Sequence, residues 1–203
     1  MTTGSASPRS RRNEASLMAM STQHVAWTAG LARALPNDGK RYEVLDGELF
    51  VSPAPSFNHQ RVVQSLFRLL DHWVRMHELG EVFIAPAEVE FSPRRLLQPD
   101  LFIIPATPGT RPRVFRDIGR LLLVVEIQSP NTARADRTTK RDIYQDERVP
   151  EYWIVDPHGR VIERWMPDDR RPEILSASIR WQPTLRVLPV EIDLPRFFAE
   201  ALD

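Results

Sequence analysis

Residues 121–130 read LLLVVEIQSP, and the fold is decided in this stretch. Five apolar residues, Leu121 to Val125, form the short continuous run that is typical of a strand buried on both faces. Glu126 continues the run, although an ionised carboxylate loses several kcal/mol of hydration when it is buried without a partner. Three explanations are open: Glu126 is solvated at the end of the strand, it pairs with a structural arginine, or it faces a cleft and binds a cation.

A second buried strand follows at 151–156, within the sequence EYWIVDP. Between the two strands, residues 136–148 have the pattern of a polar helix, with Asp136 as its N-cap and Pro150 beyond its end. Two strands joined through a helix predict a right-handed parallel crossover inside a mixed sheet.

The segments before this crossover predict a short helix, a hairpin, a long helix and two strands. The hairpin turns at Asp46-Gly47, a dipeptide that favours a tight two-residue turn. The long helix, from about Phe57 to Leu79, has an apolar face at helical spacing and either Ser56 or Asn58 as its N-cap. The other predicted elements are a helix at 27–35 and strands at 81–91 and 100–104, separated by a turn with the sequence SPRRLLQP.

After the crossover, a second hairpin around Pro167 to Arg170 and a last amphipathic turn from Pro195 complete the pattern. The sequence therefore predicts a mixed α/β fold, with a central sheet flanked by helices and β-hairpins added near both ends. We expect one domain over residues 21–203, preceded by a disordered tail at 1–20, which is rich in Ser and Arg.

Composition limits the classes of function. The chain has 203 residues, 42% of them apolar, which is enough to build a core without disulfides. It has no cysteine, so thiolate catalysis and cysteine-ligated metal sites are excluded. The net charge is zero, so any site for a polyanion has to be a local patch. No apolar run reaches the roughly 20 residues of a membrane helix, and no secretory signal is present, so we expect a cytoplasmic protein with no membrane contact.

Three ionisable residues have unusual surroundings: Asp100 at the head of the strand DLFII, Glu126 within VVEIQ, and Lys140 in the predicted helix. If the two strands are neighbours, the two carboxylates converge, and they repel each other unless a cation neutralises them. Such oxygen ligands suit Mg²⁺ or Mn²⁺, and a lysine there could orient a water or stabilise charge on a phosphate. Of the 27 basic residues only Lys40 and Lys140 are lysines.

Each residue also has an ordinary structural explanation. Asp100 can be a turn acid after Pro99, Glu126 can pair with an arginine of the 105–120 loop, and Lys140 can form a surface pair with Asp136. The remaining candidates have similar alternatives: Tyr144 as a core residue, His59 as a half-buried histidine, and Glu48 as a solvated hairpin residue.

Taken in order, these motifs resemble the PD-(D/E)XK nuclease superfamily, and within it the Uma2-like (DUF820) group of restriction-endonuclease-like proteins. The resemblance covers about residues 27–200. The motifs that carry it are YEVLDGELFVSPAPSFNHQ at 42–60, QPD at 98–100, VVEIQSP at 124–130, the Asp136, Lys140 and Tyr144 spacing, and VPEYWIVDP at 149–157.

The resemblance implies a restriction-endonuclease-like sheet and metal-dependent hydrolysis of phosphodiester bonds in nucleic acid, DNA in the first place. It implies that Asp100 and Glu126 hold Mg²⁺ or Mn²⁺ and that Glu48 assists. The superfamily's lysine two residues after the acid is Gln128 here. In Uma2-like proteins the lysine has moved to the following helix, which implies a catalytic role for Lys140 with a contribution from Gln128.

His59, Tyr144 and the loop arginines Arg111, Arg113 and Arg116 are expected to line the site or contact phosphates. Arg120 belongs to the same loop. Two other functions stay open: a catalytically silent nuclease-fold protein that binds DNA or another protein, and a module that assembles through its sheets. A homodimer is compatible with either the nuclease or the assembly module.

Overall fold

The computed structural model describes residues 1, 26–107, 109, 112–115 and 118–203. Its centre is a six-stranded sheet with the strand order β10-β9-β8-β7-β6-β3. Only β7 and β8 run parallel, so the sheet is mixed, as the sequence predicts. The strands are β3 (Gly80–Ile84), β6 (Leu101–Pro105), β7 (Leu123–Ile127), β8 (Tyr152–Asp156), β9 (Val161–Trp165) and β10 (Glu173–Leu175).

The crossover from β7 to β8 is helical, but it differs in detail from the prediction. It runs through α3 (Ala133–Ala135), the π-helix η2 (Asp136–Lys140) and α4 (Arg141–Asp146). The prediction that Asp136 caps this helix is wrong, because the helix begins one turn earlier and Asp136 is buried inside it. The predicted polar helix therefore has a buried face.

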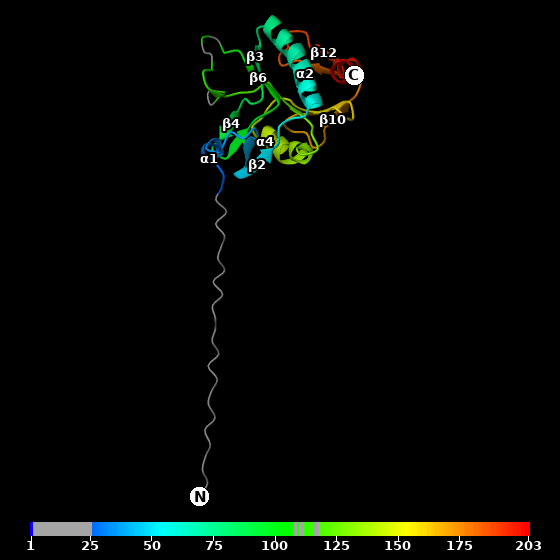
Figure 1. Cartoon of the computed structure of the whole chain (residues 1–203). Helices are drawn as coiled ribbons and strands as arrows, with labels where there is room; N and C mark the ends of the chain where they lie inside the picture. Colours follow the sequence, from blue (N-terminus) through cyan, green and yellow to red (C-terminus); the bar gives the residue numbers. More distant parts are fainter. Residues whose placement is uncertain (2–25, 108, 110–111, 116–117) are drawn as a thin grey trace.

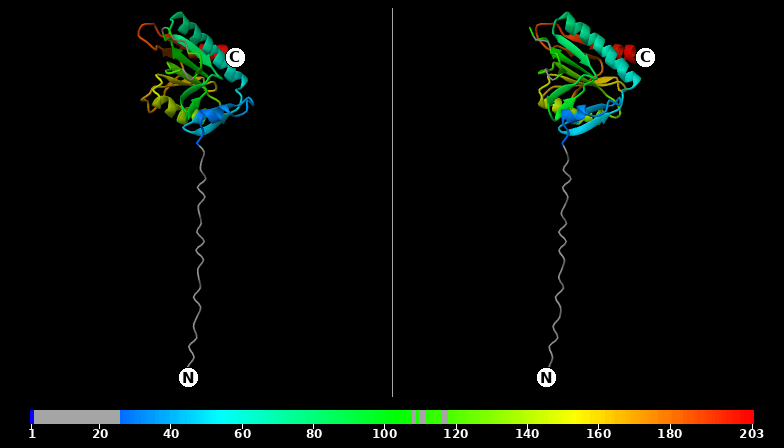
Figure 2. Two further views of the ribbon diagram at one scale, coloured as in Figure 1. Left: turned by 90° about the vertical axis from the view of Figure 1, so that its left-hand side faces the viewer. Right: turned by 60° about the vertical axis from the view of Figure 1, so that its left-hand side comes forward.

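One face of the large sheet is covered by α2 (Phe57–Met76) and α5 (Leu194–Leu202), with the hairpin of β11 (Ser178–Trp181) and β12 (Val190–Asp193) beside them. The Ser56 hydroxyl caps α2 by accepting a hydrogen bond from the amide of His59. The helix ends at Met76, before the predicted Leu79, because Glu78 has a left-handed backbone with φ of 52°. Figure 2 shows α5 alongside α2.

The other face packs against the helical crossover and a second, four-stranded sheet with the order β2-β1-β5-β4. Its hairpin turns at Asp46 and Gly47, whose φ angles of 52° and 89° are those of the predicted tight turn. The helix α1 (Ala29–Arg33) covers the outer face of this sheet. The strands are β1 (Arg41–Leu45), β2 (Glu48–Ser52), β4 (Val89–Ser92) and β5 (Arg95–Leu97).

Three sequence predictions of elements need correction. The predicted strand 81–91 is two strands in two different sheets, because Pro86 has no amide hydrogen to continue a ladder. The predicted turn SPRRLLQP contains β5, which pairs with both β1 and β4. The last amphipathic turn is the nine-residue helix α5, and the hairpin of β11 and β12 before it was not predicted.

Figure 1 places α2 and β12 in one half of the molecule and α1, β2, β4 and α4 in the other. The N-terminal end of β6, the C-terminal end of β7 and the N-terminal end of α2 come together where the halves meet. None of the helices in the described part of the chain is long and apolar enough to cross a membrane.

Candidate active site

The strands β6 and β7 bring two acidic residues together, as the sequence predicts. Their antiparallel register pairs Leu101 with Val125, so the next position places Asp100 opposite Glu126. Both side chains are almost completely buried, with 3% of Asp100 and 2% of Glu126 exposed. They line one pocket of about 160 Å³.

Asp100 is held by three donors. The Arg41 guanidinium donates to Oδ1 at 2.7 Å, and the amide of Ile127 donates to Oδ2 at 2.8 Å. The Nε2 atom of His59 lies 2.9 Å from Oδ2. Burial raises the pKa of Asp100, but the hydrogen bond and charge of His59 and the charge of Arg41 outweigh it and lower the pKa to about 2. Asp100 is therefore an anion at neutral pH.

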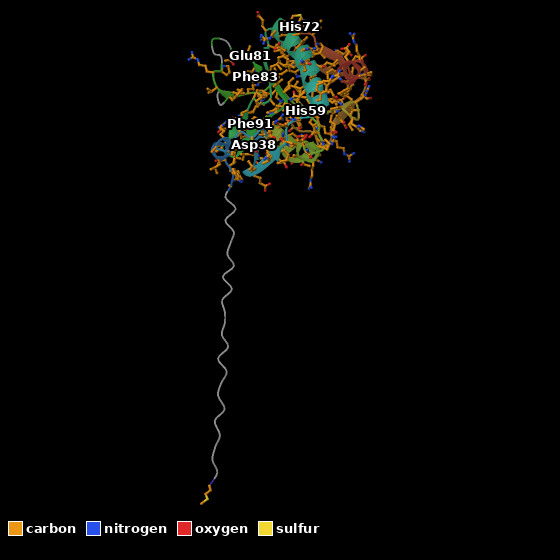
Figure 3. All side chains as sticks on the ribbon, in the orientation of Figure 1. Asp38, His59, His72, Glu81, Phe83 and Phe91 are labelled. Atoms are coloured by element: carbon orange, nitrogen blue, oxygen red, sulfur yellow. The ribbon has the colours of Figure 1, made fainter. Side chains whose placement is uncertain are left out.

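His59 reaches this site from α2. In Figure 3, His59 lies toward the end of the helix that is nearer to Asp38 and Phe91, while His72 lies toward the other end. The first turn of α2, including Ser56, forms part of the pocket wall. His59 thus lines the site, as predicted.

Glu126 has a buried partner. The Lys140 ammonium donates to Oε1 at 3.0 Å, and the Tyr144 hydroxyl donates to the same oxygen at 3.1 Å. Oε2 accepts no hydrogen bond from any residue that the structure describes. Burial raises the pKa of Glu126 well above its usual range, and repulsion from Asp100 adds to this effect against the attraction of Lys140. Of the three initial explanations, the solvated one is excluded.

Lys140 is enclosed by carboxylates, so it is not a surface residue. Only 1% of it is exposed, and Nζ lies 3.0 Å from Glu126, 3.0 Å from Glu43 and 3.8 Å from Asp136. The ring of Phe50 lies 5.8 Å from the ammonium, measured to its centroid. Burial lowers the pKa of Lys140, but the carboxylates outweigh burial and raise it, so the lysine stays protonated.

Glu43 belongs to this cluster, although the sequence analysis missed it. It lies on β1, is completely buried, and accepts a hydrogen bond from the amide of Gln98 at 2.9 Å. In RYEVL a glutamate between apolar residues fits the solvent face of an alternating strand. The sequence held one indication that Glu43 is buried: its partner in the predicted hairpin is the apolar Phe50.

Glu48 is not brought into the cluster. It begins β2 directly after the turn, opposite Leu45, and its side chain is exposed. Glu43 and Glu48 lie on the same face of the hairpin, but only Glu43 lies far enough from the turn to be covered by η2. The carboxylate beside Lys140 is thus supplied by Glu43.

Asp136 is the most isolated of these acids. It is fully buried, and neither carboxylate oxygen has a hydrogen-bond partner of normal geometry. Burial raises the pKa of Asp136 to about 6, although the charge of Lys140 opposes this shift. Its position in a π-helical turn, four residues before Lys140, keeps both side chains on the buried face.

Comparisons with known proteins give the family and the fold of the chain. The Uma2 family, described as "Putative restriction endonuclease", matches residues 31–197. The chain belongs to the Uma2 family. A crystal structure titled as a "putative nuclease belonging to DUF820" from Anabaena variabilis ATCC 29413 has a similar fold. The TM-score is 0.70 and the identity 16%, over 86% of this chain and 99% of that chain. No curated protein matches the chain.

Two other predicted site residues of the Uma2 chain have structural partners. The Gln128 amide oxygen accepts a hydrogen bond from Arg137 at 2.5 Å, and Arg137 also binds Glu163. Gln128 does not line the pocket of Asp100 and Glu126. Tyr144 is a fully buried core residue whose hydroxyl donates to Glu126, and it does not line the pocket.

Of the three loop arginines that the sequence predicts at the site, only Arg113 belongs to the described residues. Arg113 follows the opposite end of β6 from Asp100 and does not line the pocket, and Arg111 and Arg116 lie outside the described residues. The arginine in contact with Asp100 is Arg41, which was not predicted.

The donors at this Uma2 site fit a divalent metal in kind. The four buried acids and the two cations Lys140 and Arg41 leave a formal charge of −2 when His59 is neutral. The described residues contain no group of three or more His, Asp or Glu side chains that could hold a metal ion by themselves. Mg²⁺, however, is commonly held by one or two carboxylates, with water and substrate phosphate completing its shell. Asp100 and Glu126 are the residues that would hold it.

Proposed function

We propose that this Uma2 chain is a metal-dependent endonuclease that hydrolyses phosphodiester bonds in nucleic acid, DNA in the first place. One observation carries the proposal. Asp100, just before the start of β6, lies opposite Glu126 near the end of β7, the two acids line one pocket, and a buried lysine lies 3.0 Å from Glu126. The family supports the same reaction class, because it is described as a restriction endonuclease family.

Asp100 and Glu126 retain room for a metal. A carboxylate has about four lone-pair positions, and Asp100 uses three of them for Arg41, His59 and Ile127. Glu126 uses Oε1 for its two donors, which leaves Oε2. A divalent ion bound there lowers the pKa of a bound water and stabilises negative charge on the phosphate.

The surrounding residues set the charge of this pair. Arg41 and His59 keep Asp100 ionised, so that it is ready to bind a cation. Lys140 places a permanent positive charge at Glu126, and its raised pKa makes it a poor base. We therefore assign Lys140 the role of a fixed cation that positions Glu126. The first turn of α2 at the pocket wall adds a positive helix end, which favours a phosphate.

Cleavage assays test this assignment. Purified protein with Mg²⁺ or Mn²⁺ is expected to cut labelled DNA, and Glu126→Gln is expected to abolish cutting with an unchanged circular dichroism spectrum. The matched control is Glu191→Gln, an exposed acid on β12 that should leave cutting intact. If wild-type protein cuts neither DNA nor RNA with either metal, or if Glu126→Gln cuts normally, the assignment is wrong.

A second candidate is a catalytically silent nuclease-fold protein that binds nucleic acid. This alternative is favoured because cations of the protein already pair with both carboxylates: Arg41 contacts Asp100 at 2.7 Å, and Lys140 contacts Glu126. Calorimetric titration with Mn²⁺ separates the two. The nuclease requires saturable heat that Asp100→Ala removes, whereas the silent protein shows no such heat.

A further inference from the structure

The pocket of Asp100 and Glu126 has a second pocket beside it. That neighbour also measures about 160 Å³ and shares Arg41 and the segment 53–55 with the first. Its lining includes Lys40, one of the two lysines of the chain, and the amide side chain of Gln60.

A third pocket continues the depression on the other side. It measures about 410 Å³ and shares Asn131 with the central pocket. Its lining includes Arg134 and the hydroxyl-bearing Thr138 and Thr139 on the crossover helix. We call these three neighbouring pockets, which share lining residues, the groove, with a Lys40 end, a centre and an Arg134 end.

Both ends of the groove present a positive side chain to solvent. Lys40 is exposed and pairs with Asp38 at 2.7 Å, a surface contact that a stronger anion can replace. Arg134 is exposed, and its guanidinium forms no ion pair with any residue that the structure describes. Since the net charge of the chain is zero, these cations are a local feature of the groove.

The centre of the groove is recessed. Asp100 and Glu126 are nearly buried beneath two walls, the segment 53–55 on one side and Pro130 with Asn131 on the other. A flexible unpaired strand can direct one phosphodiester down into such a pocket. A duplex holds its phosphates on the outside of a stiff cylinder, so the same walls keep them away from the carboxylates.

From this arrangement we infer that the groove binds a single unpaired nucleic-acid strand. Phosphates on either side of the central phosphodiester contact Lys40 and Arg134. The inference rests on the proposed function and deepens it by naming the substrate class. Phosphate contacts position a strand without reading its sequence, so the groove predicts little sequence preference.

Glu48 sharpens the test, because it lines the Arg134 end and carries the same charge as a phosphate. Its removal should strengthen binding, whereas removal of Arg134 should weaken it. Two substitutions in one pocket therefore have opposite expected effects.

The experiment is fluorescence anisotropy with an unpaired oligothymidine and with a hairpin duplex of equal length, in EDTA and again in Ca²⁺. For the unpaired strand, Lys40→Gln and Arg134→Gln should each weaken binding about three- to tenfold. Each should also reduce the slope of log K against log salt by about 0.7. Glu48→Gln should tighten binding. The control is Arg186→Gln, an exposed arginine beyond the opposite face of the large sheet, which should bind like wild type.

Several results would overturn the inference: no binding in either buffer, tighter binding of the duplex, or Arg134→Gln behaving like Arg186→Gln. Cleavage is scored separately with Mg²⁺ and Mn²⁺. If the protein cleaves nucleic acid but the Lys40 and Arg134 substitutions do not change binding, the groove inference is rejected and the proposed nuclease function stands. If binding depends on Lys40 and Arg134 but no cleavage occurs, the proposed nuclease function is rejected and the groove inference stands.

Discussion

The buried acids of this site depend on one ammonium group, that of Lys140, for charge compensation. Lys140 is the nearest cation to Glu43, Glu126 and Asp136, which come from a strand of each sheet and from the crossover helix. Without it, several buried carboxylates would repel each other with no compensating charge. Lys140 thus stabilises the site before it can contribute to any reaction.

Replacing Lys140 by methionine should destabilise the protein by about 3–5 kcal/mol near neutral pH, because it leaves buried charges uncompensated. Urea unfolding measures the loss. The matched control is Lys40→Met at the exposed lysine, which should leave the free energy of unfolding close to that of wild type. Similar losses for both variants would show that Lys140 is not the partner of these acids.

Asp136 should impose a pH dependence on stability. Its pKa of about 6 in the folded protein lies above its ordinary value of 3.8, so the folded state binds the extra proton between these values. The free energy of unfolding therefore falls as the pH rises through this window, by up to about 3 kcal/mol. Above the window no further loss is expected.

Asp136→Asn removes this titration. Relative to wild type, the variant should gain about 2–3 kcal/mol of stability between about pH 4 and about pH 8. Asp142→Asn, an exposed acid on α4, should show no such trend. Parallel pH profiles for Asp136→Asn and wild type would contradict the raised pKa.

The sequence predicted Asp100, Glu126 and Lys140 as one site, because neighbouring antiparallel strands bring the start of one strand beside the end of the other. It did not predict Glu43 or Arg41, since their roles depend on how the second sheet packs on the first. It misassigned Asp136 as a cap, because a capping acid and a buried acid look alike at the start of a helical pattern.

At the level of helices and strands, the prediction succeeded for long or strongly apolar segments and failed for short ones. The helix α2 and the strands β7 and β8 have clear patterns over many residues. The strand β5 has three residues and was read as a turn, because Pro93 and two arginines precede its leucines. Its strand conformation comes from pairing with β1 and β4, which local sequence does not encode.

The pairing of β3 with β6 depends on one glycine. At Gly80 an added Cβ would lie 1.8 Å from the carbonyl oxygen of Ile104. Gly80→Ala should therefore push the edge strand away and cost about 3 kcal/mol. In Gly30→Ala on α1 the nearest heavy atom would be 3.9 Å away, so this control should be neutral or slightly stabilising. Thermal unfolding compares them, and equal effects would contradict the close approach.

Across the molecule as a whole, the two sheets share a core. Leu45, Val89 and Leu97 of the small sheet pack in one cluster with Val124 and Ile154 of the large sheet. The charged site lies at the same junction. The single domain over 21–203 stays a prediction from the sequence, and the cooperativity of unfolding tests it.

Urea unfolding should give one transition with the same midpoint by far-UV circular dichroism and by tryptophan fluorescence. Circular dichroism reports both sheets, whereas most of the tryptophans lie around the large sheet, including Trp73, Trp153 and Trp181. Two separated transitions would show that the small sheet and α1 unfold independently.

Because Lys140 is buried, proteolysis after this residue can measure local opening of the helical crossover. A lysine-specific protease has only two sites, after Lys40 and after Lys140. Lys40 is exposed and can be cut in the native protein, whereas Lys140 is enclosed in the helical crossover. Cleavage after Lys140 therefore requires the crossover to detach from both sheets, so the ratio of the two cuts measures how often the site opens.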